Sequence, residues 1–164
     1  MLCAVDVHYS NAAARAAAVV FSAWESERAD HEVVVDIDRV EPYVPGDFYR
    51  RELPCIAAVL ERVHAELRVI LVDGYVWLDA EGTPGLGAHL YRMRGEAAAV
   101  IGVAKSSYAG SPHARRVLRG TSLRPLYLTA AGIDLDEAAA QVAAMHGPHR
   151  IPTLLARVDR LCRR

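Results

Sequence analysis

RVILVDG, at residues 68–74, is a run of branched apolar residues that ends in an acid, and LCAVDVHY, at residues 2–9, is an apolar run with an acid in its middle. Both runs are typical of strands that are buried in a sheet. A buried carboxylate without a partner or a metal is costly. The positions of Asp6 and Asp73 are therefore the feature of this sequence that most needs a functional explanation.

The first part of the chain predicts an antiparallel start. Strands are expected at 2–9, 15–24 and 32–37, joined by short polar links as in a meander. A helical pattern follows in DFYRRELPCIAAVLERVHAEL, which begins at Asp47. Asp47 is a candidate N-cap, and Pro54 is expected to kink the helix or to delay its start.

The second part alternates between strands and helices. The expected elements are a strand at 68–73, a helix at 87–95, a strand at 97–105, a hairpin of 114–118 and 124–129, and helices near 134–146 and 151–163. Such alternation predicts parallel strands in the middle of the sheet. The predicted fold class is α/β, with a mixed central sheet flanked by helices, in which the first three strands are antiparallel and parallel strands follow.

Composition narrows the class of protein. With 164 residues, of which 52% are hydrophobic, residues 1–164 are expected to form a single domain. The net charge of −1 argues against a protein that coats nucleic acid generally. Three cysteines without metal-ligand spacing favour a reduced, cytoplasmic setting. No apolar stretch approaches the roughly 20 residues of a membrane span, so no membrane association is expected, and no obligate protein partner is evident.

The acids suggest a metal site. If the strands at 2–9 and 68–73 are neighbours, Asp6 and Asp73 meet at one edge of the sheet, and Glu52 would reach it from the following helix. Three converging carboxylates repel one another unless a divalent cation neutralises them, and Mg²⁺ prefers oxygen ligands. Each acid also has a structural explanation: Asp6 paired with His8 or a lysine, Asp73 capping a loop, and Glu52 exposed on a helix.

Five short motifs occur in an order that resembles the endonuclease V family of DNA and RNA repair nucleases. They are PYVPG (42–46), FYRRE (48–52), VDG (72–74), GVAKS (102–106) and RIP (150–152). The resemblance covers nearly the whole chain but not the usual N-terminal helical segment of the family, because the chain opens almost at its first strand. It implies a ribonuclease H-like fold and an endonuclease that hydrolyses a phosphodiester bond near deaminated bases, chiefly hypoxanthine (inosine), in DNA or RNA. The implied cofactor is Mg²⁺, with Mn²⁺ as the alternative.

The resemblance also implies roles for individual residues. Asp6, Glu52 and Asp73 would be the catalytic metal ligands, and Lys105 would contact the phosphate. Tyr43, followed by Pro45 and Gly46, would form a wedge inserted beside the lesion, and Gly85 and His89 would belong to the substrate-binding region. Backbone groups of loops 42–46 and 82–87 would read the flipped base.

The sequence departs from the family pattern in two places. Asp79 and Glu81 lie where the family has histidine and arginine, and Ile133 replaces a histidine. Acids in place of phosphate-facing donors weaken nucleic-acid binding. Two further hypotheses therefore stand beside the endonuclease: a catalytically weak or inactive protein that binds nucleic acid or purines on the same scaffold, and an interaction module with no nucleic-acid role. Asp134 is either a substitute ligand or a helix N-cap.

Overall fold

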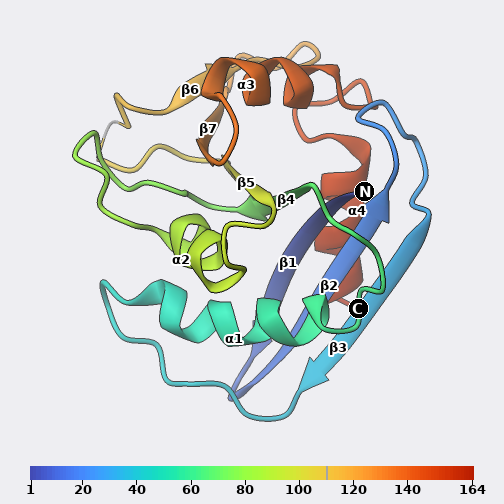
Figure 1. The fold of residues 1–164 in the computed structure, drawn as a ribbon, viewed down its shortest axis with the longest axis vertical. Coiled ribbons are helices and arrows are strands. Elements are labelled where there is room, and N and C mark those ends of the chain that lie inside the picture. The colour runs from blue at the N-terminus through green and yellow to red at the C-terminus, as the bar shows by residue number, and fades with distance from the viewer. Residues whose placement is uncertain (110) are drawn as a thin grey trace.

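The computed structural model describes residues 1–109 and 111–164, and these form a seven-stranded mixed sheet flanked by four helices (Figure 1). Across the sheet the strand order is β3-β2-β1-β4-β5-β7-β6. The strands are β1 (Leu2–Ser10), β2 (Ala13–Phe21), β3 (His31–Ile37), β4 (Val69–Asp73), β5 (Ala99–Ala104), β6 (Arg115–Val117) and β7 (Leu126–Ala131). The helices are α1 (Phe48–Leu60), α2 (Leu86–Met93), α3 (Leu135–Ala144) and α4 (Thr153–Cys162). The predicted fold class is confirmed.

The directions of the strands determine where Asp6 and Asp73 lie in the sheet. β1, β2 and β3 form the predicted antiparallel meander, while β4 pairs in parallel with both β1 and β5. The predicted hairpin of β6 and β7 is also present, and β7 is antiparallel to β5. Because β1, β4 and β5 run in the same direction, their carboxyl ends lie at one edge of the sheet. Val5 is level with Val72, which brings Asp6 and Asp73 to neighbouring positions at that edge.

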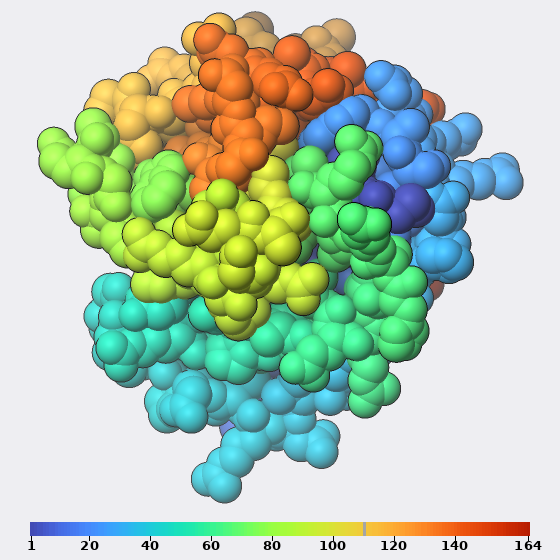
Figure 2. Space-filling model, viewed as in Figure 1, coloured from blue at the N-terminus to red at the C-terminus, as the bar shows by residue number. Residues whose placement is uncertain are grey.

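The helices cover the sheet in two layers. α1 and α2 pack on one face through Cys3 and Val5 of β1, and α3 and α4 pack on the other through Leu2 and Ala4 (Figure 1). Side chains of α1 and α2 lie against each other on the outside of the first layer (Figure 2). Successive residues of a strand point to opposite faces. Asp6 therefore faces the α4 side, like Ala4.

The start of α1 differs from the prediction. The helix begins at Phe48, so Pro54 lies within it and does not delay its start. Asp47 occupies the N-cap position, but its side chain makes no capping hydrogen bond and instead pairs with Arg50 at 3.4 Å. The backbone of Asp47, at φ −117° and ψ 36°, lies outside the extended region that a capping side chain needs.

Two expectations from composition can be compared with the structure. Cys3, Cys55 and Cys162 are all buried free thiols. No helix within residues 1–109 and 111–164 is both long and apolar enough to cross a membrane.

Candidate active site

The carboxyl ends of β4 and β5 hold an ion pair. Lys105, the residue after β5, donates a hydrogen bond from Nζ to Asp73 Oδ2 at 2.7 Å. Burial alone would lower the pKa of Lys105, but the hydrogen bond and charge of Asp73 outweigh it, so the pKa is raised and the amine stays protonated. Lys105 is also the only lysine in the sequence; the other basic side chains are arginines.

The glycine of the GVAKS motif allows the chain after Asp73 to cross β5. A Cβ on Gly102 would lie 2.5 Å from the carbonyl oxygen of Gly74 and 2.9 Å from Thr129 Oγ1. Thr129 Oγ1 in turn accepts a hydrogen bond from the Val76 N–H at 2.7 Å. This close approach fixes the turn that presents Asp73.

Asp6 lies beside this pair and is only 9% exposed. Its Oδ1 accepts a hydrogen bond from the Val7 N–H at 2.8 Å, so it has neither of the partners considered from sequence, His8 or a lysine. Burial, followed by the charge of Asp73, raises the pKa of Asp6 to about 6. A cation at this edge would favour the ionised form of this carboxylate.

Glu52 is on the buried side of α1 and is 4% exposed, which excludes the solvated position considered from sequence. Burial, with the charges of Asp6 and Asp73, raises the pKa of Glu52 to about 8. Within the described part of the chain, its Oε2 is buried and has no hydrogen-bond partner. A buried carboxylate oxygen without a donor is expensive, so this oxygen is available to a ligand.

These acids suit a hard cation by their chemistry. They are oxygen donors of like charge, and the pKa values of Asp6 and Glu52 are raised first by burial and then by the charge of the neighbouring acids. As the side chains are placed in residues 1–109 and 111–164, however, no three acidic, histidine or cysteine side chains form a group that could hold a metal ion. The fold thus brings the carboxylates to one end of the sheet without closing them into a ligand cluster.

Sequence reasoning missed a fourth acid, Asp159 on α4. Its charge raises the pKa of both Asp6 and Lys105, and its Oδ1 pairs with Arg163 at 2.9 Å. A small cavity of about 30 Å³ lies between the strand ends and α4, lined by Asp6, Asp73 and Lys105 from the sheet and by apolar residues that include Leu155. Residues four apart share a helix face. The helical spacing of Leu155 and Asp159 was therefore a signal in the sequence.

The acids outside this group have local roles. Asp134 caps α3: its Oδ1 accepts a hydrogen bond from the Glu137 N–H at 3.0 Å, which confirms the N-cap interpretation. Asp79 holds a turn by accepting hydrogen bonds from the N–H groups of Glu81 and Thr83 at 3.1 and 2.9 Å. Glu81 itself is exposed.

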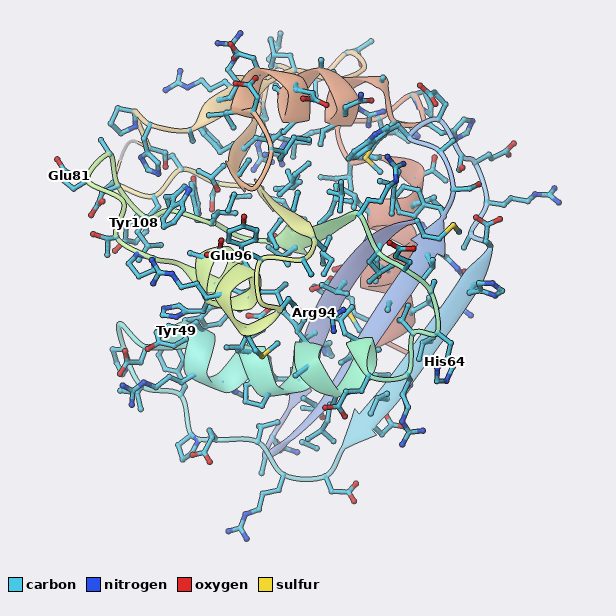
Figure 3. The ribbon with its side chains drawn as sticks, in the orientation of Figure 1. Tyr49, His64, Glu81, Arg94, Glu96 and Tyr108 are labelled. Carbon is cyan, nitrogen blue, oxygen red and sulfur yellow. The ribbon has the colours of Figure 1, made fainter. Side chains whose placement is uncertain are left out.

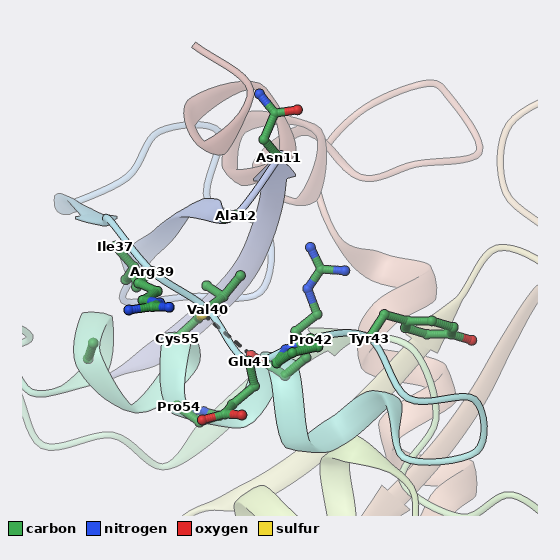
Figure 4. Close-up of a pocket in the computed structure, with 12 residues that line it drawn as sticks. Asn11, Ala12, Ile37, Arg39, Val40, Glu41, Pro42, Tyr43, Pro54 and Cys55 are labelled. Atoms are coloured by element: carbon green, nitrogen blue, oxygen red, sulfur yellow. Dashed lines mark hydrogen bonds between the residues drawn. The ribbon is translucent and has the colours of Figure 1, made fainter.

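The loop before α1 presents aromatic side chains to solvent. Tyr43 is 56% exposed, and its ring meets that of Phe48 edge-on, with the centroids 6.4 Å apart. Pro45 and Gly46 are exposed in the same loop. Behind the loop lies an open cavity of about 910 Å³, and the Tyr43 ring extends away from the residues lining its far side, such as Ile37 and Cys55 (Figure 4).

His89 lies on α2, and Gly85 is the residue that immediately precedes this helix. The His89 ring stacks on Tyr49 of α1, with centroids 3.6 Å apart and an interplanar angle of 15°. Burial, followed by the charge of Arg92, lowers the pKa of His89. Gly85 is the N-cap residue of α2, and its N–H donates to the Val76 carbonyl at 2.8 Å. His89 thus packs against α1, while Gly85 packs against the segment that follows β4.

Tyr75 organises the segment after Lys105, a function that sequence reasoning did not find. Its hydroxyl donates to the Ser106 carbonyl at 2.8 Å and accepts from the Tyr108 N–H at 3.2 Å. Tyr108 is 53% exposed and lies on the same side of the molecule as Tyr49 and Glu81 (Figure 3). The exposed aromatics Tyr43 and Tyr108 could both stack on bases.

Comparison with known proteins agrees with this arrangement. The family profile described as Endonuclease V matches residues 1–131. An endonuclease V of Streptomyces avermitilis is 32% identical over 184 residues, which cover 98% of this chain and 78% of that protein. The endonuclease V of Thermococcus kodakarensis is 31% identical over 161 residues, covering 98% of this chain and 76% of that protein.

Solved structures share the fold. The crystal structure of the Streptomyces avermitilis endonuclease V superimposes with a TM-score of 0.78 at 27% identity, covering 99% of this chain and 79% of that one. Ciona intestinalis endonuclease V, crystallised with a 24mer DNA containing an inosine followed by a ribo-adenosine, gives a TM-score of 0.83 at 20% identity over 99% of this chain and 83% of that one. The profile match and the identity to curated relatives show that this chain belongs to the endonuclease V family.

Proposed function

We propose that this protein is a Mg²⁺-dependent endonuclease that hydrolyses a phosphodiester bond near a deaminated base, hypoxanthine above all, in DNA or RNA. The observation that carries the proposal is the grouping of Asp6, Asp73 and Glu52 with the one lysine of the chain at a single end of the sheet, in a member of the endonuclease V family. Asp159, on α4, adds negative charge in the neighbourhood of this group. The buried free thiols support action in a reduced compartment such as the cytoplasm.

Asp6, Asp73 and Glu52 would hold the cation, with Mn²⁺ as the alternative to Mg²⁺. Bound there, the metal supplies positive charge that polarises the phosphate and activates water for attack. Lys105 keeps its proton and places an ammonium at the same edge, where it stabilises negative charge that develops on the phosphate oxygens. Asp73 orients that ammonium through the 2.7 Å hydrogen bond.

Cleavage of end-labelled oligonucleotides tests the proposal. Single- and double-stranded substrates with one inosine, and matched substrates with adenosine in its place, are incubated with Mg²⁺ or with a chelator, as DNA and as RNA. We expect a cut near the inosine only when Mg²⁺ is present. Absence of cleavage from every inosine substrate under these conditions would refute the proposal.

The departures from the family pattern favour one alternative, a protein that binds nucleic acid or a purine but cuts poorly. Asp79 and Glu81 place negative charge where a family member has donors for phosphate, and Ile133 cannot donate a hydrogen bond from its side chain. Salt-sensitive binding to an inosine oligonucleotide, without any Mg²⁺-dependent cut, would be the result that supports this alternative.

Tyr43 is expected to act on the substrate rather than on the fold. In Tyr43→Ala, we expect cleavage of a duplex with one inosine to fall by roughly 10-fold, because stacking on a base contributes about 1–3 kcal/mol. Cleavage of the single strand should fall less, since an unpaired base costs less to extrude. The thermal midpoint should stay unchanged because the ring is 56% exposed. Equal losses on single and double strands would contradict a wedge function.

A further inference from the structure

Arg119, in the link between β6 and β7, is a buried arginine with only 6% of its surface exposed. Its guanidinium makes five hydrogen bonds, and every acceptor is a backbone carbonyl. The acceptors are Ala143 at 3.5 Å, Met145, Gly147 at 3.1 Å, His149 at 2.7 Å and Arg150 at 3.4 Å. All five N–H donors of an arginine are thus used.

This arrangement fixes the chain that links α3 to α4. The carbonyls at the C-terminal end of a helix have no partner within the helix, and a cation there also interacts favourably with the helix dipole. Gly120 allows the two segments to approach closely, because a Cβ at this position would collide with the Pro148 carbonyl. A lysine in place of Arg119 has only three donors and no planar fork, so it could not satisfy the same carbonyls.

Arg150, at the end of the segment held by Arg119, holds a second set of carbonyls. Its Nε donates to the Arg124 carbonyl at 2.9 Å, and its Nη2 donates to the carbonyls of Pro125, at 2.8 Å, and of Lys105. The pairing of β5 with β7 ends at Ala104, which is level with Tyr127. The backbone of Lys105 lies one residue beyond that pairing, and Arg150 ties it to the chain leading into β7.

We propose that Arg150 is a positioning residue for Lys105, and that Arg119 holds Arg150 in place. The inference rests on the proposed function, because it assigns to Lys105 a role at the phosphate. Arg150 touches neither Asp73 nor the other acids through any hydrogen bond found in the described residues; its connection to the site is the carbonyl of Lys105. The following residue, Ile151, lines the small cavity beside Asp6 and Lys105. Movement of this segment would therefore change the shape of the cavity.

A double-mutant cycle, measured as kcat, tests whether Arg150 acts through Lys105. In Arg150→Ala, kcat for the inosine substrate is expected to fall roughly 10- to 100-fold with KM changed less than about 3-fold, since a displacement near 1 Å of a catalytic group has effects of this order. In a Lys105→Met background, adding Arg150→Ala should lower kcat less than about 2-fold. An equal fall in both backgrounds would overturn the proposal, because Arg150 would then act independently of Lys105.

A readout that needs no activity comes from the single lysine. In protein labelled at lysine ¹³Cε, one Cε–Hε signal reports Lys105 alone. If Arg150 positions Lys105, the Lys105 ammonium should move away from Asp73 in Arg150→Ala. Asp73→Asn should therefore shift the lysine signal of the otherwise unaltered protein, and it should shift the signal of Arg150→Ala much less. An unchanged signal in Arg150→Ala would overturn the proposal. If the natural chain cuts no inosine substrate, the proposed function fails while this measurement still decides the positioning of Lys105.

Two further variants separate positioning from general destabilisation. Arg157→Ala removes an arginine that makes two hydrogen bonds of 2.7 Å to Glu32, and Glu32 lies on the edge strand β3, which β2, β1 and β4 separate from β5. This variant should leave both kcat and the lysine signal unchanged. Arg119→Lys is expected to reproduce the kcat loss and the signal change of Arg150→Ala. If Arg119→Lys lost thermal stability but kept the Lys105 signal of the unaltered protein, the part of the proposal that concerns Arg119 would be overturned.

Discussion

Replacing Asp6 by asparagine is expected to lower the rate of Mg²⁺-dependent cleavage by about 1,000-fold or more. The change removes a formal charge from the candidate metal site while keeping the size of the side chain. A metal contributes several kcal/mol to stabilising charge in the transition state, and each 1.4 kcal/mol corresponds to a factor of ten in rate. The measurement is single-turnover cleavage of an inosine oligonucleotide at saturating protein and a series of Mg²⁺ concentrations.

The Asp6 variant should also keep its fold. Asp6 is 9% exposed and its pKa is raised to about 6, so its ionised form is unfavourable in the metal-free protein. Asparagine retains an oxygen that can accept the Val7 hydrogen bond. The thermal midpoint in chelator should therefore not fall. Asp36→Asn is the matched control, because Asp36 is a strand carboxylate that lies outside the site and pairs with Arg15 at 2.6 Å. The Asp36→Asn variant should cleave at the same rate as the unaltered protein. Natural activity in Asp6→Asn would remove Asp6 from the metal site.

Replacing Glu52 by glutamine is expected to abolish activity and, in chelator near pH 8, to raise the thermal midpoint on the order of 5 °C. Burial and the charges of Asp6 and Asp73 raise the pKa of Glu52 to about 8. An ionised Glu52 is therefore costly in the metal-free fold, and a neutral amide of the same shape removes that cost. Mg²⁺ should stabilise the natural protein against heat and should stabilise the variant far less.

The pH dependence has a definite sign. Between about pH 4.5 and 8, the folded metal-free protein keeps the Glu52 proton while the unfolded chain has lost it, so the folded state binds more protons and stability falls as pH rises. Asp6 adds a fall of the same sign between about pH 4 and 6. In Glu52→Gln the fall above pH 6 should disappear. Thermal melts in chelator from pH 4.5 to 8.5 measure both effects.

An exposed glutamate at the end of the same helix provides the control. Glu61→Gln should leave the pH dependence of the natural protein intact, since Glu61 is solvated at the C-cap of α1. If Glu52→Gln kept the full fall in stability up to pH 8, the burial of an ionisable Glu52 next to the other acids would be wrong.

Local pattern was sufficient for most of the fold. The branched run at 68–73 and the apolar run at 2–9 became β4 and β1, because strands buried on both faces are continuously apolar in sequence. The sequence pattern did not predict the start of α1 correctly. Asp47 is a residue type that often caps helices, but its backbone angles do not allow its side chain to form the capping hydrogen bond. A cap depends on φ and ψ as well as on residue type, and residue type alone does not fix those angles at Asp47.

The sequence alone identified the candidate site residues and their order along the chain. Glu52, Asp73 and Lys105 stand in the short motifs FYRRE, VDG and GVAKS, and Asp6 stood out as an acid within an apolar strand pattern. Only the tertiary structure decided their partners: that Lys105 pairs with Asp73, that Glu52 is buried without a donor, and that Asp159 joins them from α4 while Asp134 does not. The reason is physical. Burial and electrostatic coupling depend on distances in space, and residues such as Asp6 and Asp159, separated by most of the chain, become neighbours only when α4 packs back on β1.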